Sequence, residues 1–396
     1  MPVRRACMAE PDVARFEALL TSQGRELLDR IASEAPGPDT ALRIGASLRG
    51  LYPAELVIEA LAQHELRLQA RAKFGRASEM FFTRAGLEQA SSEVVARYRA
   101  RRYAGAACVA DLCCGIGGDL IALAAGHHVL AVDRDPLHLR IAQENAEVYD
   151  VAKRVTAVEA DARDVDLARA DAVFIDPARR SGDRRMRAGD SEPPLGWCVS
   201  LAAKVASVGV KAAPGLPHDA VPSTWELEFI AVGRDLKEAV AWSPVLATCR
   251  TRATILPDGH TLGPEPGPTV EVRPPGEFLL DPNPAVTRAG LVQEVARRLA
   301  AWKIDERIAF LSADVPLRTP FGRGLRIIDS APWDQKSLPA RLRKLDVGAV
   351  DMRRRGLAGD VDQLHRQLKL SGTRRVTLVM TRVRDKPWGF VCVDVD

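Results

Sequence analysis

The chain has 396 residues, 46% of them hydrophobic, and a formal net charge of +4, so we expect a protein of two or three globular domains. Its apolar runs are all shorter than the roughly 18 residues of a membrane-spanning helix, which argues against an integral membrane protein. The first residues, MPVRRA, lack the apolar core of a signal peptide, and we therefore expect a cytoplasmic protein.

Residues 1–100 have the spacing of amphipathic helices. Apolar residues recur at helical intervals in two groups, Val13, Phe16, Leu19 and Leu20, and then Leu27, Leu28 and Ile31. The Pro-Gly-Pro segment at 36–38 separates these first helices from the next. We predict an N-terminal helical domain over residues 1–100.

A glycine-rich turn follows. The stretch Asp111-Leu-Cys-Cys-Gly-Ile-Gly-Gly-Asp119 lies between the apolar run 106–110 and the helical run 120–125. This order is typical of a strand, a tight turn and a helix whose unpaired N–H groups face a ligand. The next apolar strand, 128–132, ends in Asp133, an acid placed to bind ribose hydroxyls. We therefore expect an adenosine-type cofactor.

The glycine spacing argues against a dinucleotide cofactor. A nicotinamide or flavin fingerprint has glycines at the first, third and sixth positions of its loop. Counting from Gly115 puts Leu120 in the sixth position, and counting from Cys113 puts a cysteine in the first. The alternative is a strand–turn–helix that binds no ligand. The polar residues at the ends of the following strands argue against this alternative.

Three further segments continue the same pattern. Asp135 and Pro136 have the places of the N-cap and first residue of a helix that runs toward Asn145. A predicted strand over 155–158 leads to Asp161 and Ala162, and a buried strand over 171–175 ends in Asp176 and Pro177. Because carboxyl ends of parallel strands meet along one crevice, we predict an α/β, Rossmann-like sheet over residues 101–257. Its later strands are expected at 208–211, 225–232, 238–242 and 252–256.

The pattern Asp-x-Cys-x-Gly-x-Gly resembles motif I of class I S-adenosylmethionine (SAM) methyltransferases, with Cys113 in the usual place of the first glycine. This resemblance implies SAM as the cofactor and a contact from the acid Asp161 to the adenine amino group. The residues that it implies for the cofactor site are Asp111, Cys113, Gly115, Gly117, Asp133, Asp161 and Ala162.

The Asp176-Pro-Ala-Arg-Arg180 segment resembles the strand end of amine-directed nucleic-acid methyltransferases, which carry Asp/Asn/Ser-Pro-Pro-aromatic. In that family the acid and a backbone carbonyl hold the exocyclic amine in line with the methyl group. The resemblance implies Asp176, Pro177 and Arg179 as catalytic residues. Ala178 and Arg179 replace the second proline and the aromatic residue, which weakens the case for an amine acceptor.

The same Asp-Pro-Ala-Arg form also resembles RNA 5-methyluridine methyltransferases. Those enzymes need a cysteine nucleophile after the next strand, and residues 208–215 contain none. A uracil-carbon mechanism therefore lacks its nucleophile unless Cys198 or Cys249 supplies it.

Arginines crowd the loop after this motif. Guanidinium groups pair with phosphates, and a basic cleft concentrates polyanions. The alternative is a solvated surface in an arginine-rich chain. We predict that this loop binds nucleic acid through Arg180, Arg184, Arg185 and Arg187.

The Pro/Gly-rich segment 257–275 marks a boundary, and we expect a C-terminal α+β domain over residues 276–396. Its predicted elements include a helix over 285–302 and a hairpin of strands 376–381 and 389–393. This layout, together with residues 81–89, resembles bacterial SAM-dependent methyltransferases that have a THUMP-like C-terminal domain. Motif I and residues 145–149 also resemble trimethylguanosine synthase-type RNA methyltransferases.

These resemblances imply a SAM-dependent methyltransferase that modifies a nucleic-acid acceptor, a base in tRNA or rRNA, with RNA as its partner. A non-catalytic protein that binds SAM and RNA through a degenerate motif is one alternative, and a small-molecule methyltransferase is another. The seven cysteines show no C-x-x-C spacing, so we expect neither a disulfide framework nor a metal site.

Overall fold

The computed structural model describes residues 3–34, 37, 39–178, 180–181, 184–185, 191–357, 361–368 and 370–395. The chain divides into two compact units, Met1–Glu226 with Ala239–Thr248, and Leu227–Glu238 with Cys249–Asp396. Residues 249–257, which the sequence analysis assigns to the sheet domain, belong to the second unit in this division. As independently folding domains, the segments 1–100, 101–257 and 276–396 remain a prediction.

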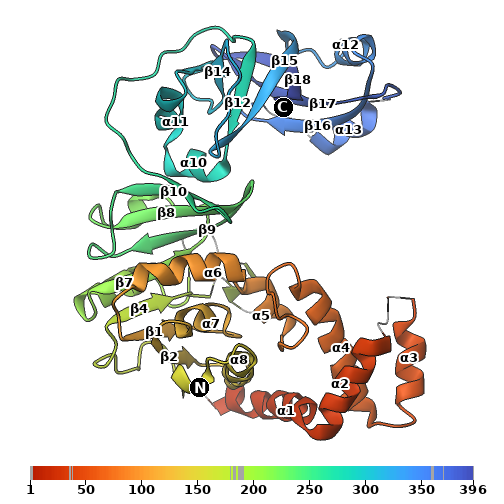
Figure 1. The fold of residues 1–396 in the computed structure, drawn as a ribbon, viewed down its shortest axis with the longest axis vertical. Coiled ribbons are helices and arrows are strands. Elements are labelled where there is room, and N and C mark those ends of the chain that lie inside the picture. The colour runs from red at the N-terminus through yellow and green to blue at the C-terminus, as the bar shows by residue number, and fades with distance from the viewer. Residues whose placement is uncertain are drawn as a thin grey trace. The chain divides into compact units, whose positions relative to one another are not determined.

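The first unit begins with helices, at the red and orange end of the ribbon in Figure 1. They are α1 (Val3–Leu20), α2 (Ser22–Glu34), α3 (Ala41–Leu48), α4 (Ala54–Ala70), α5 (Arg84–Gln89) and α6 (Glu93–Ala100). The predicted helical spacing at 13–31 is confirmed, because Phe16, Leu19, Leu27, Leu28 and Ile31 are all buried in one apolar core. That core also contains Ile116 and Ile141, so it reaches the glycine turn and the helix over 136–148.

A twisted parallel sheet forms the rest of this unit. Its strands are β1 (Cys108–Leu112), β2 (His128–Asp133), β3 (Val155–Glu159), β4 (Ala172–Ile175) and β7 (Ser207–Ala212). They are followed by β9 (Asp235–Trp242), of which residues 239–242 belong to this unit. The order is β9-β7-β4-β1-β2-β3, with β9 antiparallel to β7. From β1 the chain moves outward to β2 and β3, and it then returns to the other side of β1 as β4. The carboxyl ends of β1 and β4 are therefore a topological switch point, where open α/β sheets bind ligands.

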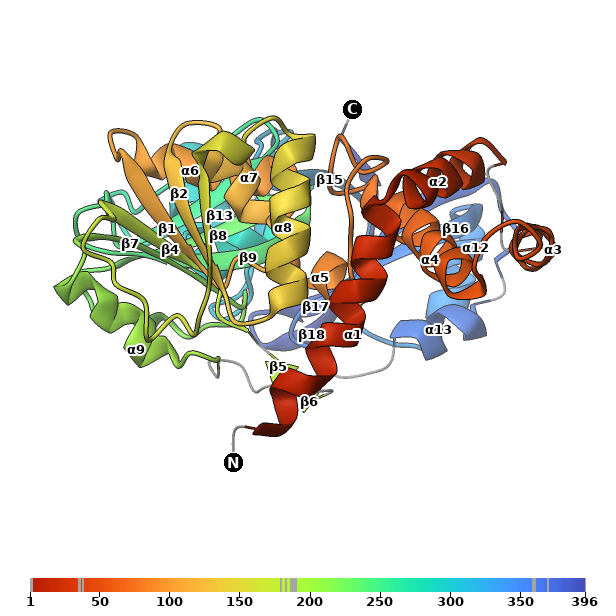
Figure 2. The same ribbon diagram turned by 90° about the horizontal axis from the view of Figure 1, so that it is seen from below.

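Helices cover both faces of this sheet. Figure 2 shows α7 (Gly118–Ala124) and α8 (Pro136–Val148) on one face and α9 (Leu195–Ser200) on the other. The predicted N-cap is confirmed: the Asp135 carboxylate accepts hydrogen bonds from the N–H groups of Leu137 (3.0 Å) and His138 (3.3 Å), and Pro136 is the first helical residue. Short 3-10 helices complete the connections at Arg101–Tyr103, Ala152–Arg154, Leu201–Ala203 and His218–Ala220.

The second unit contains two groups of strands. The first group is β8 (Glu226–Val232), parallel to β10 (Thr251–Leu256), with β11 (His260–Leu262) antiparallel to β10. The second is a sheet in the order β13-β14-β12-β15-β18-β17-β16. These strands are β12 (Phe278–Pro282), β13 (Trp302–Lys303), β14 (Leu311–Ala313), β15 (Gly322–Pro332), β16 (Val347–Arg354), β17 (Arg374–Val383) and β18 (Lys386–Asp394). The antiparallel β17–β18 pair confirms the predicted hairpin.

One predicted helix is wrong. The segment expected as a continuous helix over 285–302 contains α10 (Pro284–Ala289) and α11 (Val292–Arg298), and it ends in the strand β13. Gly290 separates the two helices because its left-handed conformation (φ 75°) caps α10 and stops its hydrogen-bond ladder. The remaining helices of this unit are α12 (Leu338–Lys344) and α13 (Val361–Gln367). Among the described residues, no helix is both long enough and apolar enough to cross a membrane.

Candidate active site

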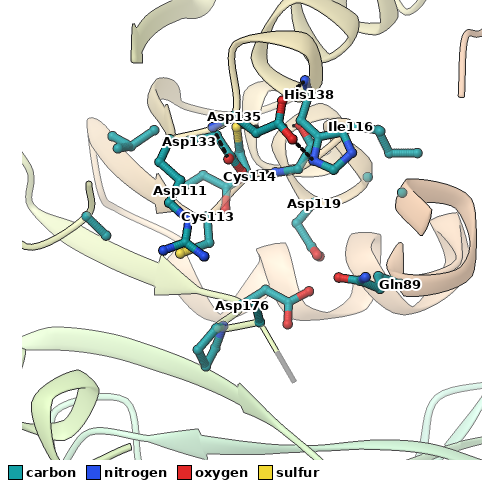
Figure 3. Close-up of a pocket in the computed structure, with 18 of the residues that line it drawn as sticks. Gln89, Asp111, Cys113, Cys114, Ile116, Asp119, Asp133, Asp135, His138 and Asp176 are labelled. Carbon is teal, nitrogen blue, oxygen red and sulfur yellow. Dashed lines mark hydrogen bonds and ion pairs between the residues drawn. The ribbon is translucent and has the colours of Figure 1, made fainter. Parts of the chain in front are cut away.

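A cavity of about 420 Å³ lies at the switch point of the first unit (Figure 3). The strand ends and turns after β1, β2, β3 and β4 line it, together with α5. Eight predicted site residues border this cavity: Asp111, Cys113, Gly115, Asp133, Asp161, Ala162, Asp176 and Pro177. Gly117, which was predicted to contact the cofactor, does not line it. Arg179 and Arg187 lie outside the described residues.

The turn after β1 adopts left-handed backbone conformations. Gly115 has φ 55° and Gly117 has φ 88°, values that glycine tolerates without a steric cost. A Cβ on Gly117 would approach the Cα of Ala142 in α8 to 3.2 Å, so Gly117 lets α7 begin closely against α8. Cys113 also has a positive φ of 62°, where a cysteine is strained. Gly117 therefore packs against α8, whereas Cys113 and Gly115 face the cavity.

Asp133 connects two of the turns that border the cavity. One of its carboxylate oxygens accepts the N–H of Gly115 (2.8 Å) and the other accepts the N–H of Asp135 (2.9 Å). These contacts fix the side chain at the carboxyl end of β2, and each oxygen has further lone pairs that can accept a hydrogen bond from a ligand hydroxyl.

Carboxylates dominate the lining of the cavity. They belong to Glu88, Asp111, Asp119, Asp133, Asp135, Asp161, Asp176 and Glu192. Asp111 is 1% exposed, and neither of its oxygens has a hydrogen-bond partner among the described residues. Burial, with the neighbouring carboxylates of Asp119 and Asp176, raises the pKa of Asp111 well above its usual range. Such a cavity favours a ligand that brings positive charge and hydrogen-bond donors.

Asp161 has a strong partner that the sequence analysis missed. Arg163 donates to both oxygens of Asp161 (2.8 and 2.6 Å) and also pairs with Glu192 (2.9 Å). This guanidinium lowers the pKa of Asp161 to about 2. Arg163 therefore links the loop after β3 to Glu192, which lies at the end of the loop that follows Asp176.

Asp176 forms a partly buried ion pair at the end of β4. Its Oδ2 accepts a hydrogen bond from the Nζ of Lys211 at 2.6 Å, and Lys211 is only 5% exposed. The strand itself was predicted from sequence, but the role of Lys211 was not. The available signal was a single lysine inside the apolar run Val208–Ala212, because a buried lysine requires a partner.

The cysteines of this region are poorly suited to nucleophilic attack. Cys113 and Cys114 line the cavity, whereas Cys198 is fully buried and does not. Burial and the carboxylates of Asp133 and Asp176 raise the pKa of Cys113 above its usual range, and burial raises that of Cys198 to about 12. Thiols with raised pKa values stay protonated at neutral pH and are weak nucleophiles. Among the described residues, no group of three or more His, Cys, Asp or Glu side chains could hold a metal ion.

The wall opposite the sheet comes from the helical region. Gly86, Glu88, Gln89 and Ala90 of the α5 segment border the cavity. The Nζ of Lys73 donates to the carbonyl oxygens of Leu87 (2.6 Å), Glu88 (3.2 Å) and Ala90 (2.9 Å) and so fixes the end of α5. Lys73 lies 14 to 17 residues before these carbonyls, and the sequence pattern did not predict the contacts.

The arginine loop is described only in part. Its backbone forms a short antiparallel pair, β5 (Arg180–Ser181) with β6 (Arg184–Arg185). The side chains of Arg180, Arg184 and Arg185, like Arg179 and Arg187 entirely, lie outside the described part of the chain. Their predicted contact with nucleic acid stays a prediction.

Comparison with known proteins gives matches over each part of the chain. Residues 322–393 match the THUMP domain-like family, residues 106–187 match the RNA cap guanine-N2 methyltransferase family, and residues 12–70 match a domain of unknown function. Two strains of Mycobacterium tuberculosis, CDC 1551 / Oshkosh and ATCC 25618 / H37Rv, have an uncharacterised S-adenosylmethionine-dependent methyltransferase that is 36% identical over 341 residues. That alignment covers 80% of this chain and 90% of the relative.

A solved structure shares the fold. A crystal structure from Porphyromonas gingivalis W83, described as a methyltransferase, superposes with a TM-score of 0.73. The match covers 94% of this chain and 99% of the other, at 21% identity. The predicted arrangement of a Rossmann-like methyltransferase sheet, an N-terminal helical region and a C-terminal THUMP-like domain is confirmed.

Proposed function

We propose that this chain, which belongs to the family of S-adenosylmethionine-dependent methyltransferases, transfers the methyl group to a base in tRNA or rRNA. One observation carries the choice of an RNA acceptor. The RNA cap guanine-N2 methyltransferase model matches residues 106–187, the same stretch that contributes the glycine turn, the strand ends and Asp176 to the cavity. The match to a THUMP domain-like family in the second unit supports the same choice.

The cavity residues fit the cofactor. SAM carries a sulfonium and an ammonium, and the buried, unpartnered oxygens of Asp111 are suited to receive an ammonium donor. Asp133 is proposed to bind the ribose, and Asp161 and Ala162, which also line the cavity, are proposed to contact the adenine. We assign cofactor binding to Asp111, Cys113, Gly115, Asp133, Asp161 and Ala162, with Gly117 shaping the turn. When bound, SAM supplies a methyl group activated by the sulfonium.

The chain contributes mainly positioning to such a reaction. Methyl transfer is a direct displacement, so the acceptor atom must be held in line with the methyl group. Asp176 and Pro177 end β4 at the cavity, and the Asp176 carboxylate can accept a hydrogen bond from the acceptor. Arg179, two residues after Pro177, is proposed to touch the acceptor. Cys198 is fully buried, does not line the cavity and has a raised pKa, which disfavours the alternative that attacks uracil through this cysteine.

RNA is proposed to reach this site over the arginine loop. Phosphates on either side of the acceptor base would pass the residues that follow Asp176, and Arg180, Arg184, Arg185 and Arg187 supply positive charge there. The cavity itself is acidic and would repel phosphate, so the polynucleotide backbone is expected to stay outside while the base enters.

Methyl transfer in vitro tests the proposal. Purified protein is incubated with SAM and total RNA from cells that lack the gene, and S-adenosylhomocysteine release is measured. We expect release that requires RNA and stops when the RNA is digested beforehand. Release that persists with small metabolites and not with RNA would support a small-molecule methyltransferase instead.

A further inference from the structure

Lys211 occupies an unusual position in the parallel sheet. It lies on β7, one residue after Val210, which pairs with Ile175 of β4, and on the other side it pairs with Val240 of β9. Lys211 therefore stands beside Asp176 at the carboxyl end of the sheet. Because Lys211 is only 5% exposed, its ammonium has lost most of its hydration and needs a compensating interaction.

The contacts of Lys211 supply that interaction and point toward the cavity. Its Nζ donates to Oδ2 of Asp176 at 2.6 Å and to the carbonyl oxygen of Gln89, at the end of α5, at 3.3 Å. Asp176 and Gln89 both line the cavity, whereas Lys211 does not. Figure 3 shows the Asp176 carboxylate turned toward Gln89 and Asp119. Lys211 thus lies behind the cavity wall and can act on a bound molecule only through the residues that it holds.

The electrostatic setting makes this support necessary. Asp176 shares the cavity with the carboxylates of Asp111, Asp119 and Asp133, which repel a further negative charge. Arg99 is the cation that offsets Asp119, because it donates to Asp119 and to Ser91. Lys211 contacts Asp176 directly, and this ion pair holds the carboxylate in place at the end of β4.

We propose that Lys211 is a positioning residue for methyl transfer: it holds the Asp176 carboxylate in one orientation through Oδ2, with Oδ1 directed to an N–H of the acceptor. This inference rests on the proposed function and refines it. An acceptor that presents an N–H donor, such as an exocyclic base amine, satisfies Oδ1, whereas a bare ring carbon leaves it unpaired. Tying Asp176 to Gln89 also couples the acceptor side of the cavity to the α5 wall.

The test compares four variants: Lys211→Met, Lys211→Arg, Asp176→Ala and the double variant K211M/D176A. Turnover is measured as S-adenosylhomocysteine release on RNA from cells without the gene, and SAM affinity by calorimetry. We expect K211M to lower kcat about 100-fold, the typical cost of a misplaced reacting group, while the Kd for SAM stays within about threefold. K211R should recover part of the loss, because it keeps the charge.

The double variant separates positioning from general structural damage. If Lys211 acts through Asp176, K211M/D176A should be no slower than D176A alone, since the effects of residues that act as a unit do not add. Lys204→Met is the matched control, because Lys204 is exposed in the same unit and should turn over normally. If K211M does not fold, comparison of K211R with wild type still tests the geometry of the pair.

Wild-type turnover by K211M, or fully additive losses in the double variant, would overturn the inference. Failure of the proposed function looks different: the wild-type protein itself would release no S-adenosylhomocysteine with any RNA.

Discussion

The side chain of Asn145 in α8 forms a double hydrogen bond with the backbone of Phe81. Its Oδ1 accepts the Phe81 N–H at 2.8 Å and its Nδ2 donates to the Phe81 carbonyl at 3.0 Å. The same Nδ2 donates to the carbonyl of Ile116 in the glycine turn at 2.9 Å. One fully buried amide thus attaches the segment that leads into α5 to the turn beneath the cavity.

Replacing Asn145 with alanine should therefore lower both the stability of the protein and its affinity for SAM. Three buried backbone groups would lose their partner, which should cost at least about 2 kcal/mol and lower the melting temperature by roughly 4–8 °C. SAM affinity should fall as well, since the turn and the α5 wall lose their connection. Differential scanning calorimetry and titration calorimetry measure the two effects. Gln143→Ala, an exposed change on the same helix, should alter neither, and an unchanged melting temperature in N145A would contradict this role.

Asp133→Ala tests the ribose contact. We expect SAM binding to weaken by about 1–3 kcal/mol, because a charge-assisted hydrogen bond is lost. The wild-type protein should bind no NAD, since its glycine spacing does not match a dinucleotide fingerprint. Titration calorimetry with both cofactors provides the measurement, with the exposed Asp164→Ala as the control. Equal SAM affinity in D133A would remove Asp133 from the site.

Asp111→Asn should stabilise the protein and weaken its binding of SAM. The native pKa of Asp111 is raised, so the wild type loses stability as pH rises from about 4, the unfolded value, through the higher native pKa. Asparagine does not titrate, and the advantage of D111N in melting temperature should grow with pH over this window. SAM binding at neutral pH should weaken by about 1.5–3 kcal/mol, the worth of a hydrogen bond to a charged group.

Melting curves at a series of pH values, together with calorimetric titrations, check both halves of this prediction. Asp164→Asn, an exposed change, should show no pH-dependent difference. If D111N bound SAM as well as wild type, the unpartnered carboxylate would have no part in the cofactor site.

The arginine loop should determine the salt dependence of RNA binding. Each arginine–phosphate contact releases counterions, so affinity falls with salt and the slope shrinks when contacts are removed. We expect alanine at Arg184, Arg185 and Arg187 to weaken RNA binding and flatten its slope, with SAM affinity nearly unchanged. Filter binding from low to high salt measures this. The exposed triple change of Arg43, Arg49 and Arg71 is the control, and a wild-type slope in the loop variant would make the loop a solvated surface.

Much of the cavity could be predicted from sequence because its residues follow a local rule. Asp133, Asp161 and Asp176 come after three successive predicted strands, and parallel strands bring such residues to one edge. The N-cap at Asp135 was equally local. The glycine turn was located correctly, but Gly117 packs against α8, because spacing alone does not tell which side of a turn a glycine serves.

The contacts that sequence did not reveal are long-range pairings. Lys211 and Asp176 lie 35 residues apart, and Asn145 and Phe81 lie 64 apart. The residues next to these four in sequence do not indicate which residue each one contacts. The pairs form only when the sheet and the helices pack together. The break at Gly290 was missed for a related reason, since an isolated glycine in a helical pattern is tolerated in many helices and ends others.

The most direct measurement of the central claim is mass spectrometry of modified nucleosides in tRNA and rRNA from cells with the gene, without it, and with Asp176→Ala in its place. Asp176 is proposed to orient the acceptor and not to bind the cofactor, so D176A protein should bind SAM within about threefold of wild type, a difference below 1 kcal/mol. We predict one methylated nucleoside that is present with the wild-type gene, absent without it, and still absent with D176A. An identical set of methylated nucleosides in all three cell lines would contradict the account.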